Sequence, residues 1–375
     1  MKEKDNFKSG PPDTGFAGKL SDYIYSRSFS YGIILIPVIA LVILVFLIFI
    51  FSDNPFRTLF FFFAGPFRNI FSLSNMLNAS VPLILGALGV IIAMKSGSLN
   101  LGGEGQVYLG AFVTTAIALQ FSYLHELPAD GRLIGFIGAV TALVIGSLCS
   151  GALAAISGFC KAQWNTTELI TTFLLSYAVI HVVNYLVTGP FLDPETSLIS
   201  TKKIAENMRL PFIIKQSGLS SGIFIALIFV FIVHVFLSKT KLGYEFRMAG
   251  LNELFARYGG INTKLNTVLA FLFSGCLYGF AGGVTILGTH FAVVKEFSAG
   301  LGWNGLAAAL IARFYPPAVI PAALFFAWLG SGARIAMQNT GLTADVASIV
   351  QAVILFLSTS LVLLNMKKKR MLKNE

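Results

Sequence analysis

The polar residues that could do chemistry lie in an unusual place, between two apolar segments. The stretch KSGSLNLGGEGQVYLGA, residues 95–111, contains Asn100, Glu104 and Gln106 among closely spaced glycines. In hydrocarbon an unpaired backbone group costs several kcal/mol, so an unwound passage is tolerated only against protein or a water-filled cavity. These three side chains could therefore face a polar solute inside a cavity. Alternatively, the passage is an interfacial turn in which Lys95 and Glu104 are wetted by lipid headgroups.

A second glycine-rich break, SAGLGWNG at residues 298–305, follows a later apolar segment. Trp303 could stack on a ring-bearing solute, and the Asn304 amide can both donate and accept hydrogen bonds, as purine edges require. A tryptophan in such a place could equally anchor a helix at the membrane interface. The two breaks together give five candidate pathway residues, which are Asn100, Glu104, Gln106, Trp303 and Asn304.

Residues 239–264 form the most informative polar connection. The segment GYEFRMAGLNELFARYGGIN has helical composition, begins and ends in glycine, and mixes charged residues with leucine, methionine and phenylalanine. This pattern predicts an amphipathic helix beside the membrane. Such a helix could dock into a groove on another protein or lie at the lipid surface.

Other chemistry has little support in the sequence. There is no G-x-x-x-x-G-K-[ST] phosphate loop, and the G-x-S-x-G match at residues 218–222 lacks the strand–turn–helix setting of a nucleophile. The four histidines have no metal-ligand spacing, and Cys149, Cys160 and Cys276 lie in apolar stretches without C-x-x-C spacing. We therefore predict no catalytic residues, no metal site and no cofactor bound by this chain. Carboxylates beside the apolar segments are nearly confined to Glu104 and Glu168, which leaves few candidates for a proton relay.

The elements that must position these residues are membrane helices. The chain has 375 residues, of which 55% are hydrophobic and only 12% charged, about half the charged share of an ordinary soluble protein. Although its net charge is +10, the basic residues lie in short segments between apolar runs, which is typical of membrane topology rather than of nucleic-acid binding. The sequence predicts about ten spans, at 31–52, 74–94, 106–123, 133–157, 168–188, 219–238, 265–294, 305–315, 317–338 and 343–364.

The domain organisation follows from these spans. We expect a cytoplasmic N-terminal segment at residues 1–30, a transmembrane domain at 31–365 and a basic cytoplasmic tail at 366–375. The first apolar run is longer and lies further from the start than the core of a cleavable signal peptide, so we expect it to be a retained anchor. Lys and Arg are concentrated on the side of both termini, so the positive-inside rule places both termini in the cytoplasm.

The two breaks occupy matching places in two four-span units, residues 74–188 and 265–364. The second span enters from outside and the seventh from inside, and each is followed by a glycine-rich break and then a helix of small residues. Paired, glycine-interrupted segments in two halves are typical of a transport site near the membrane midplane. We therefore predict an inverted repeat with glycine-broken re-entrant helices.

Several blocks of the sequence resemble one family in the same order. NLGGEGQVYLGA resembles the N-[IL]-G-x-E-G-Q signature of permease subunits of bacterial ABC importers for nucleosides and simple sugars, within the branched-chain amino acid/ribose permease group. TELITTFLLSYAVIHVVNYLVTGPF, FRMAGLNELFARYGGIN, SGCLYGFAGG and GLGWNGLAAALIARFYP are similar to the family's fifth span, cytoplasmic coupling loop, seventh span and re-entrant segment. Together these blocks cover most of residues 75–320. The chain departs from the family at Gly103, Ser176 and Asn304, where a branched residue, an asparagine and an aspartate are usual.

The resemblance implies an all-α polytopic membrane protein of the type II-like ABC importer class. It implies a transport subunit, not an enzyme, in the bacterial inner membrane. Its expected partners are ABC ATPase subunits that bind ATP and magnesium, a second permease subunit, an extracytoplasmic solute-binding lipoprotein and membrane lipid. The coupling loop would contact the ATPase through Glu245, Arg247, Asn252, Arg257 and Tyr258.

The expected solute is a nucleoside or a simple sugar. A branched-chain amino acid permease and an ion-driven secondary transporter are the alternatives. The scarcity of intramembrane carboxylates argues against the secondary transporter.

Overall fold

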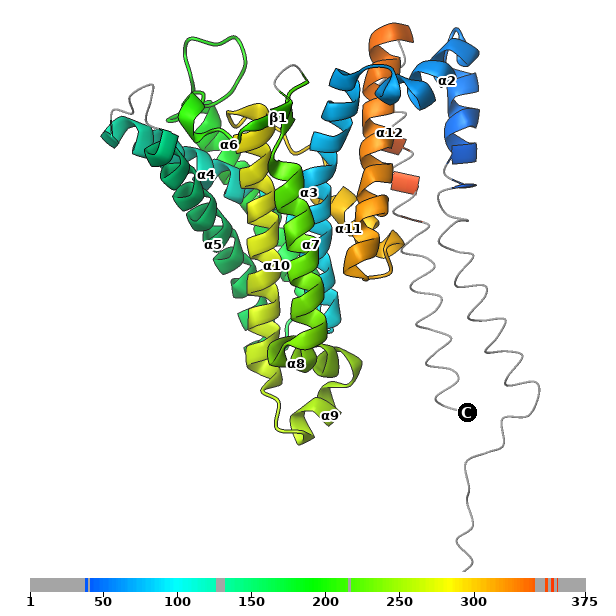
Figure 1. Ribbon diagram of the computed structural model, residues 1–375. Coiled ribbons are helices and arrows are strands. Elements are labelled where there is room, and N and C mark those ends of the chain that lie inside the picture. The colour runs from blue at the N-terminus through cyan, green and yellow to red at the C-terminus, as the bar shows by residue number, and fades with distance from the viewer. Residues whose placement is uncertain are drawn as a thin grey trace, which may run out of the picture.

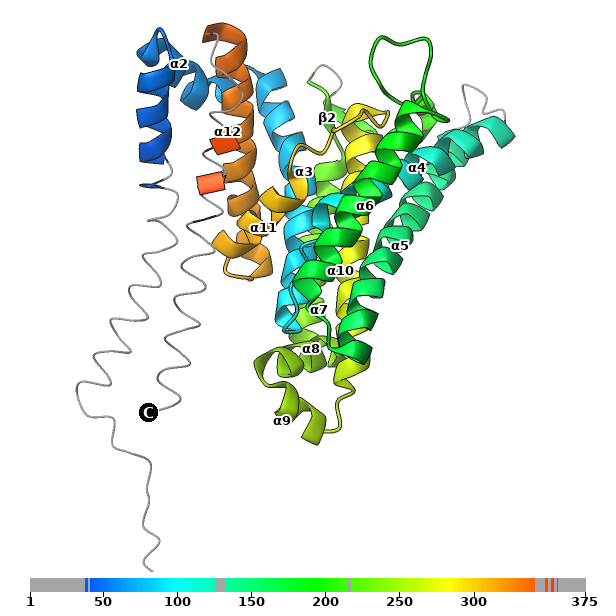
Figure 2. The ribbon, with the colours of Figure 1, turned by 180° about the vertical axis from the view of Figure 1, so that it is seen from behind.

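The computed structural model describes residues 38–39, 41–125, 132–214, 217–340, 348–349, 352–353 and 356 of the chain. Over these residues the protein is a bundle of long helices that run roughly side by side (Figures 1 and 2). The longer helices are α3 (Ile70–Lys95), α4 (Gly103–His125), α5 (Arg132–Trp164), α6 (Glu168–Thr188), α7 (Gly222–Lys239), α10 (Thr263–Thr285) and α12 (Val319–Thr340). The shorter helices are α2 (Pro55–Ala64), α8 (Lys241–Leu251), α9 (Glu253–Tyr258) and α11 (Leu301–Ile311).

Six helical segments of the described residues are long and apolar enough to cross a membrane: Ile70–Lys95, Leu133–Trp164, Glu168–Thr188, Gly222–Lys239, Thr263–His290 and Pro316–Thr340. Each coincides with a predicted span to within four residues at both ends, except that Leu133–Trp164 ends seven residues beyond the predicted span 133–157. The predicted first and tenth spans, 31–52 and 343–364, lie partly outside the described residues, although the helix Leu41–Phe51 belongs to the first. The membrane-helix class is therefore confirmed, whereas the number of ten spans stays a prediction.

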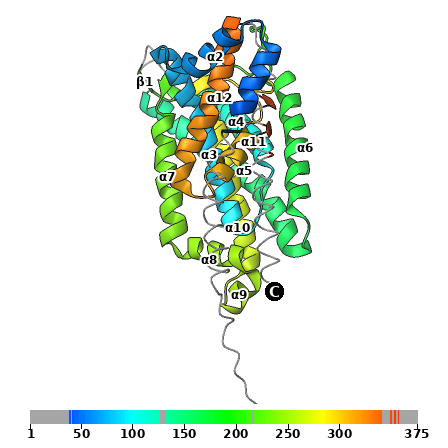
Figure 3. The same cartoon turned by 90° about the vertical axis from the view of Figure 1, so that its right-hand side faces the viewer.

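The two ends of the bundle differ. One end carries α8 and α9, and the other carries the antiparallel pair β1 (Phe212–Ile214) and β2 (Leu219–Ser220) (Figure 1). We refer to these as the α9 end and the β1 end. Figure 3 shows α6 and α7 at opposite edges of the bundle, with α12 and α2 in front of α3. The exposed sides of α6 and α7 are apolar, as Tyr185 at 70% and Phe231 at 69% exposure show, which is the surface that lipid requires.

Helix α10 is central because it packs against α3, α4 and α5. Its inner side is rich in small residues, and the backbones of Gly110 in α4 and Gly279 in α10 approach so closely that a Cβ on Gly110 would lie 2.3 Å from the Gly279 carbonyl oxygen. Small residues permit such contact in membranes, where apolar helices gain little from leaving lipid for protein. The core therefore depends on close backbone packing of these four helices.

Helices α4 and α5 differ in length by an amount that matters for the first break. They have 23 and 33 residues, and α4 ends and α5 begins at the β1 end (Figure 1). At 1.5 Å per residue, α5 is about 15 Å longer than α4. Because the two helices pack side by side, α4 begins well inside the bundle, and residues 96–102 cover the remaining distance from the α9 end.

The connection between α6 and β1, residues 189–211, covers the turn that follows α10. This turn, Ile286–His290, is a π-helix, a form that often marks functional sites. The backbone N–H groups of Ile204 and Leu210 donate to Phe291 and Leu287 at 2.8 and 2.9 Å. These two hydrogen bonds fix the position of the π-helical turn, from which residues 291–300 lead to α11.

Two local predictions differ from the structure. The predicted single amphipathic helix at 239–264 is two helices, because Asn252 is extended (φ −157°) and its side chain caps α9 by accepting from the Phe255 N–H at 3.0 Å. Helix α2 was not predicted. It lies in a stretch interrupted by proline and arginine, and it packs against α12, where Trp328 Nε1 donates to the Phe63 carbonyl at 3.3 Å.

Candidate functional site

The two glycine-rich breaks meet at one carboxylate. Glu104, in the first turn of α4, accepts hydrogen bonds from the Gly300 N–H at 3.0 Å, the Gly302 N–H at 2.7 Å and the Ser298 hydroxyl at 2.5 Å. Both N–H groups belong to the start of α11, where they have no partner within the helix. Glu104 therefore caps α11 from a neighbouring helix, and we call this contact the junction.

The junction brings two helix N-termini together. The start of a helix carries a partial positive charge, which a nearby carboxylate stabilises. Glu104 lies in the first turn of its own helix and against the first turn of α11, so one negative charge serves both ends. The arrangement explains why an acidic residue occurs among glycines deep in an apolar bundle.

The junction requires close backbone approach. A Cβ on Gly302 would lie 2.3 Å from the Glu104 backbone nitrogen, so no other residue fits there without displacing α11. On the other side, a Cβ on Gly103 would lie 2.4 Å from Cζ of Tyr278, a fully buried residue of α10. The void between these residues and Trp303 has no room for a water molecule. The breaks are thus packed against each other in this conformation.

Helix α6 satisfies the first turn of α4. The hydroxyls of Thr172 and Ser176, one turn apart on α6, accept from the N–H groups of Leu101 and Gly105 at 3.2 and 2.8 Å. In a membrane interior these donors would otherwise be unpaired at considerable cost.

The Asn100 and Gln106 amides bond to each other. Asn100 Nδ2 donates to Gln106 Oε1 at 2.8 Å, and Gln106 Nε2 donates to Asn100 Oδ1 at 3.0 Å. Asn100 also donates to the Ser274 hydroxyl of α10 at 3.0 Å and accepts from the Gly102 N–H at 2.9 Å. Both amides are almost completely buried. In this conformation these hydrogen bonds stabilise the backbone of the first break.

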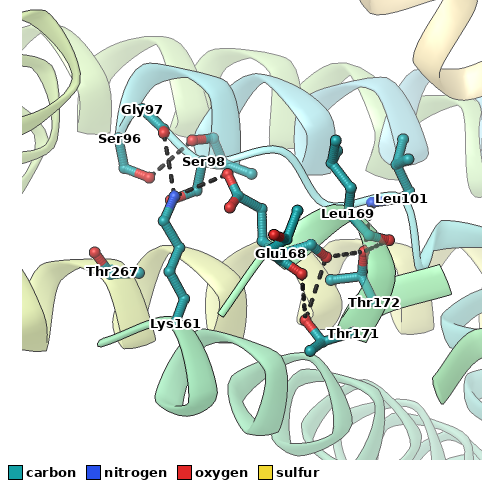
Figure 4. Close-up of polar contacts among 12 residues, drawn as sticks. Ser96, Gly97, Ser98, Leu101, Lys161, Glu168, Leu169, Thr171, Thr172 and Thr267 are labelled. Carbon is teal, nitrogen blue, oxygen red and sulfur yellow. Dashed lines mark hydrogen bonds and ion pairs between the residues drawn. The ribbon is translucent and has the colours of Figure 1, made fainter. Parts of the chain in front are cut away.

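A charged clamp lies on the α9 side of the junction (Figure 4). Lys161, in the last turn of α5, contacts Glu168, in the first turn of α6, at 2.9 Å. The same ammonium group donates to the Ser98 hydroxyl at 3.0 Å and to the Gly97 carbonyl at 3.4 Å. The pair thus ties the first break to two helix ends, and each charge suits the dipole of its own helix.

A cavity of about 660 Å³ lies on the β1 side of the junction. Residues of α3, the π-helical turn, the start of α11 and the second half of α12 line it, and Ser298 and Asn304 belong to its wall. The junction therefore separates a cavity toward the β1 end from the clamp toward the α9 end.

Comparison with known proteins agrees with this architecture. Residues 72–359 match the family described as the permease component of branched-chain amino acid transport systems. The chain belongs to this family. The permease is 32% identical to the probable riboflavin import permease protein of Treponema pallidum, over 82% of this chain and 79% of that protein. It is 30% identical to the guanosine ABC transporter permease protein of Bacillus subtilis, over 79% of this chain and 83% of that protein.

A glucose ABC transporter permease protein of Haloferax volcanii is also 30% identical, over 77% of each chain. No solved structure matches the permease significantly. The family predicted from the sequence blocks is confirmed, and with it the role of a transport subunit rather than an enzyme.

The structure brings the five predicted pathway residues to one neighbourhood. Glu104 forms the junction, and Asn100 and Gln106 support it. Trp303 lines the junction void and lies 6.4 Å from Phe173 of α6, ring centre to ring centre. Asn304 lines the larger cavity.

The five residues predicted to contact an ATPase lie together at the α9 end. Tyr258 is 92% exposed, and Arg257 forms an exposed pair with Glu253 at 3.3 Å. By contrast, Glu245 accepts from Asn266 of α10 at 3.2 Å, and Arg247 has a buried Nε without a hydrogen-bond partner. Asn252 caps α9. Arg257 and Tyr258 are therefore surface groups, whereas Glu245 and Asn252 position α8 and α9.

Two important residues, Tyr278 and Arg334, were not predicted. Tyr278 occupies the space beside Gly103, which accounts for the absence of the family's usual branched residue there. Ser176, where asparagine is usual, bonds the Gly105 N–H directly. Arg334 of α12 lines the cavity. Its position inside an apolar span was a signal in the sequence, because charges in membrane spans usually face a cavity or a partner.

We predict that Glu104→Gln destabilises the permease by about 1–3 kcal/mol, because the amide nitrogen cannot accept a hydrogen bond and leaves an α11 N–H unpaired. Uptake by the assembled transporter should fall with it. Thermal unfolding of the purified complex and uptake measure both effects. Glu296→Gln, in the same connection but with an exposed side chain, is the control. Equal behaviour of the two variants would show that the carboxylate does not hold the junction.

We predict that Lys161→Met loosens the first break at the α9 end. Ser96 is buried beside the clamp, so a cysteine at this position, with the three native cysteines replaced by alanine, should react slowly with a polar thiol reagent. Removing the ammonium group, or replacing Glu168 by glutamine, should raise this rate severalfold. Lys264→Met at the same end, whose lysine contacts only Gln163 at 3.4 Å among the described polar contacts, should leave the rate unchanged. An unchanged rate in the clamp variants would contradict the clamp.

Proposed function

We propose that this permease is the membrane-spanning subunit of an ATP-driven ABC importer that carries nucleosides across the bacterial inner membrane. The observation that supports the proposal most is the junction of two interrupted helices beneath a 660 Å³ cavity. Broken helices that meet inside a bundle are the usual construction of a transporter site. The cavity volume lies within the range of about 300–1,000 Å³ that small-molecule sites occupy.

A nucleoside fits the relatives and the cavity. The relatives named for guanosine and riboflavin handle solutes that combine a planar nitrogen heterocycle with a hydroxylated chain or ring. In the proposed route the solute enters the cavity past Asn304 and passes the junction at Glu104 and Trp303. Asn100 and Gln106 then exchange their mutual hydrogen bonds for contacts with the solute or with a moved α11.

The α9 end is the proposed ATPase contact. Leu251, Leu254, Phe255 and Tyr258 are between 66% and 92% exposed there. Exposed apolar groups on a short polar helix, outside the membrane-spanning helices, suit docking into a groove on another protein. The ATPase subunits would supply ATP and magnesium, and a second permease subunit and a solute-binding lipoprotein would complete the importer.

The proposed orientation puts the α9 end in the cytoplasm together with both termini. The helix termini at this end carry five lysines, in agreement with the positive-inside rule: Lys95, Lys161, Lys239, Lys241 and Lys264. The β1 end, with the cavity, would then face the solute-binding protein. The two four-span units would be inverted copies that place the two breaks at matching depths.

The alternatives differ in their energy source and solute. An ion-driven carrier would take up solute without the ATPase subunits, whereas a sugar or branched-chain amino acid permease would differ only in its cargo. We expect proteoliposomes that contain the permease, its ATPase subunits and its binding protein to accumulate radiolabelled guanosine or inosine only with internal ATP. Accumulation of glucose or leucine, but of no nucleoside, would overturn the proposed solute. Uptake without ATPase subunits would overturn the ABC mechanism.

We predict that Phe255→Ser and Tyr258→Ser lower uptake at least tenfold, because docking surfaces depend on a few buried aromatic groups. ATP hydrolysis should then no longer respond to the loaded binding protein. Tyr185→Ser, an exposed aromatic on α6, is the matched control. Arg257→Glu should uncouple the transporter in the same way.

The double exchange Arg257→Glu with Glu253→Lys separates two explanations for the charge. It restores the pair within α9 but presents reversed charges to a partner. Restored coupling in the exchanged protein would contradict a direct contact between Arg257 and the ATPase.

A further inference from the structure

The cavity at the β1 end has a wall suited to a particular kind of solute. Its polar side chains are amides, hydroxyls, one guanidinium group and the His290 imidazole, and the rings of Phe297 and Phe326 add flat apolar surface. No carboxylate belongs to the wall among the described residues. An amino acid would leave its ammonium group without a counter-charge there, so the wall disfavours that class of solute.

Arg334 is the only charged group permanently ionised in this wall among the residues described. It lies on α12 six residues before the helix end, which corresponds to about 9 Å inside the β1 end. Its Nη2 donates to the Ser331 hydroxyl at 3.1 Å, and Ser331 is buried one turn deeper in the helix. The guanidinium group is therefore directed back along α12, away from the helix end, and the residue stays exposed where it lines the cavity.

The guanidinium group has donors left for a ligand. It carries five N–H donors, and Ser331 is the one hydrogen-bond partner found for it among the described residues. No carboxylate of the described residues lies within ion-pair distance of it. A charge in a membrane span is costly and is retained where it faces a cavity and serves a ligand.

Neighbouring polar groups in the wall divide into two kinds. The Asn78 amide already has partners within the protein: it donates to the Gly218 carbonyl at 2.8 Å and accepts from the Ser220 N–H at 3.0 Å. Asn75, Thr289 and Gln338 are exposed to the cavity. Asn75, Thr289 and Gln338 therefore offer a ligand in the cavity groups that donate and, through their oxygens, accept hydrogen bonds.

We propose that Arg334 recognises the solute by binding two adjacent acceptor atoms on a planar heterocycle, as the carbonyl oxygen and neighbouring imidazole nitrogen of a 6-oxopurine present. A planar, forked donor fits such a pair bidentately, as arginine does with guanine. The Phe297 ring, stacked at 5.1 Å on Tyr108, gives the same cavity a fixed apolar wall. This inference rests on the proposed function and specifies which feature of a nucleoside the permease reads.

The test compares guanosine with 7-deazaguanosine, which keeps the carbonyl oxygen and lacks the neighbouring acceptor nitrogen. Both are assayed for ATP-driven uptake in the assembled transporter with one and the same binding protein. The binding protein contributes equally to every permease variant, so a change in the ratio of the two kcat/KM values between variants reports the permease alone.

We expect Arg334→Gln and Arg334→Lys to reduce the preference for guanosine on the order of tenfold, because neither side chain provides the fork. Arg57→Gln, an exposed arginine outside the cavity near the same end, should keep the wild-type ratio. An unchanged ratio in both Arg334 variants overturns the inference even if overall uptake falls. Failure of the wild type to carry any nucleoside overturns the proposed function, and the inference with it, and is distinguishable because it precedes any comparison of variants.

A second measurement does not depend on the folding of an Arg334 variant. With the native cysteines replaced by alanine, a cysteine at Thr289 should react with a polar thiol reagent, and guanosine should slow this reaction. Ribose at the same concentration should protect weakly, and guanosine monophosphate, which carries the same base, should protect no better than guanosine. Equal protection by ribose would overturn recognition of the base, and stronger protection by the monophosphate would show that Arg334 binds an anion instead.

Discussion

The architecture depends on how backbone N–H groups are satisfied where two helices begin inside an apolar bundle. A helix that starts at depth exposes several donors that water cannot reach. At the start of α11, Glu104 accepts from the N–H groups of Gly300 and Gly302 and from the Ser298 hydroxyl. At the start of α4, the hydroxyls of Thr172 and Ser176 accept from the backbone N–H groups. Interrupted helices are possible here because these acceptors lie on neighbouring helices.

The pairing of these N–H groups has a consequence for how α11 can move. The side chains that pair the first N–H groups of α4 lie on α6, whereas Glu104, which pairs those of α11, lies on α4. The starts of the two helices are therefore held by different helices. If α11 moves away from α4, the Glu104 carboxylate must find new donors, and a polar solute or water can supply them. A junction that is dry and closed in one state can therefore become a polar passage in another without exposing unpaired groups to lipid. The cavity on one side and the Lys161 clamp on the other are consistent with such alternation.

Sequence reasoning located the breaks because glycine, polar residues and an acid in an apolar context conflict with a simple helix. It located most helix boundaries within a few residues because hydrophobic length is a strong signal. It could not foresee that Asn100 and Gln106 bond each other, since a six-residue separation across an unwound passage fixes no distance. It also could not pair Gly103 with Tyr278, because their complementarity arises between helices far apart in the sequence.

The divided coupling segment shows a different limit. The composition of residues 239–264 predicts one amphipathic helix, and the charges fit that prediction. A single asparagine changes the outcome, since Asn252 leaves the helical conformation and caps the next helix. Propensity alone does not decide between an asparagine within a helix and one that starts a helix. Here the division of the segment accompanies the burial of Phe246 in α8 and of Ala256 in α9.

The position of α8 suggests how a distant contact could reach the junction. A Cβ on Gly250 of α8 would lie 2.3 Å from the Lys95 carbonyl oxygen and 2.8 Å from the Gly97 nitrogen, so the helix abuts the first break without intervening side chains. The break leads within a few residues to Glu104, and Glu104 holds α11. Because tightly packed interiors transmit strain, a displacement of α8 would move the first break with it. Under the proposed function, the same close packing that removes water from the junction would carry the motion of the ATPase subunits to it.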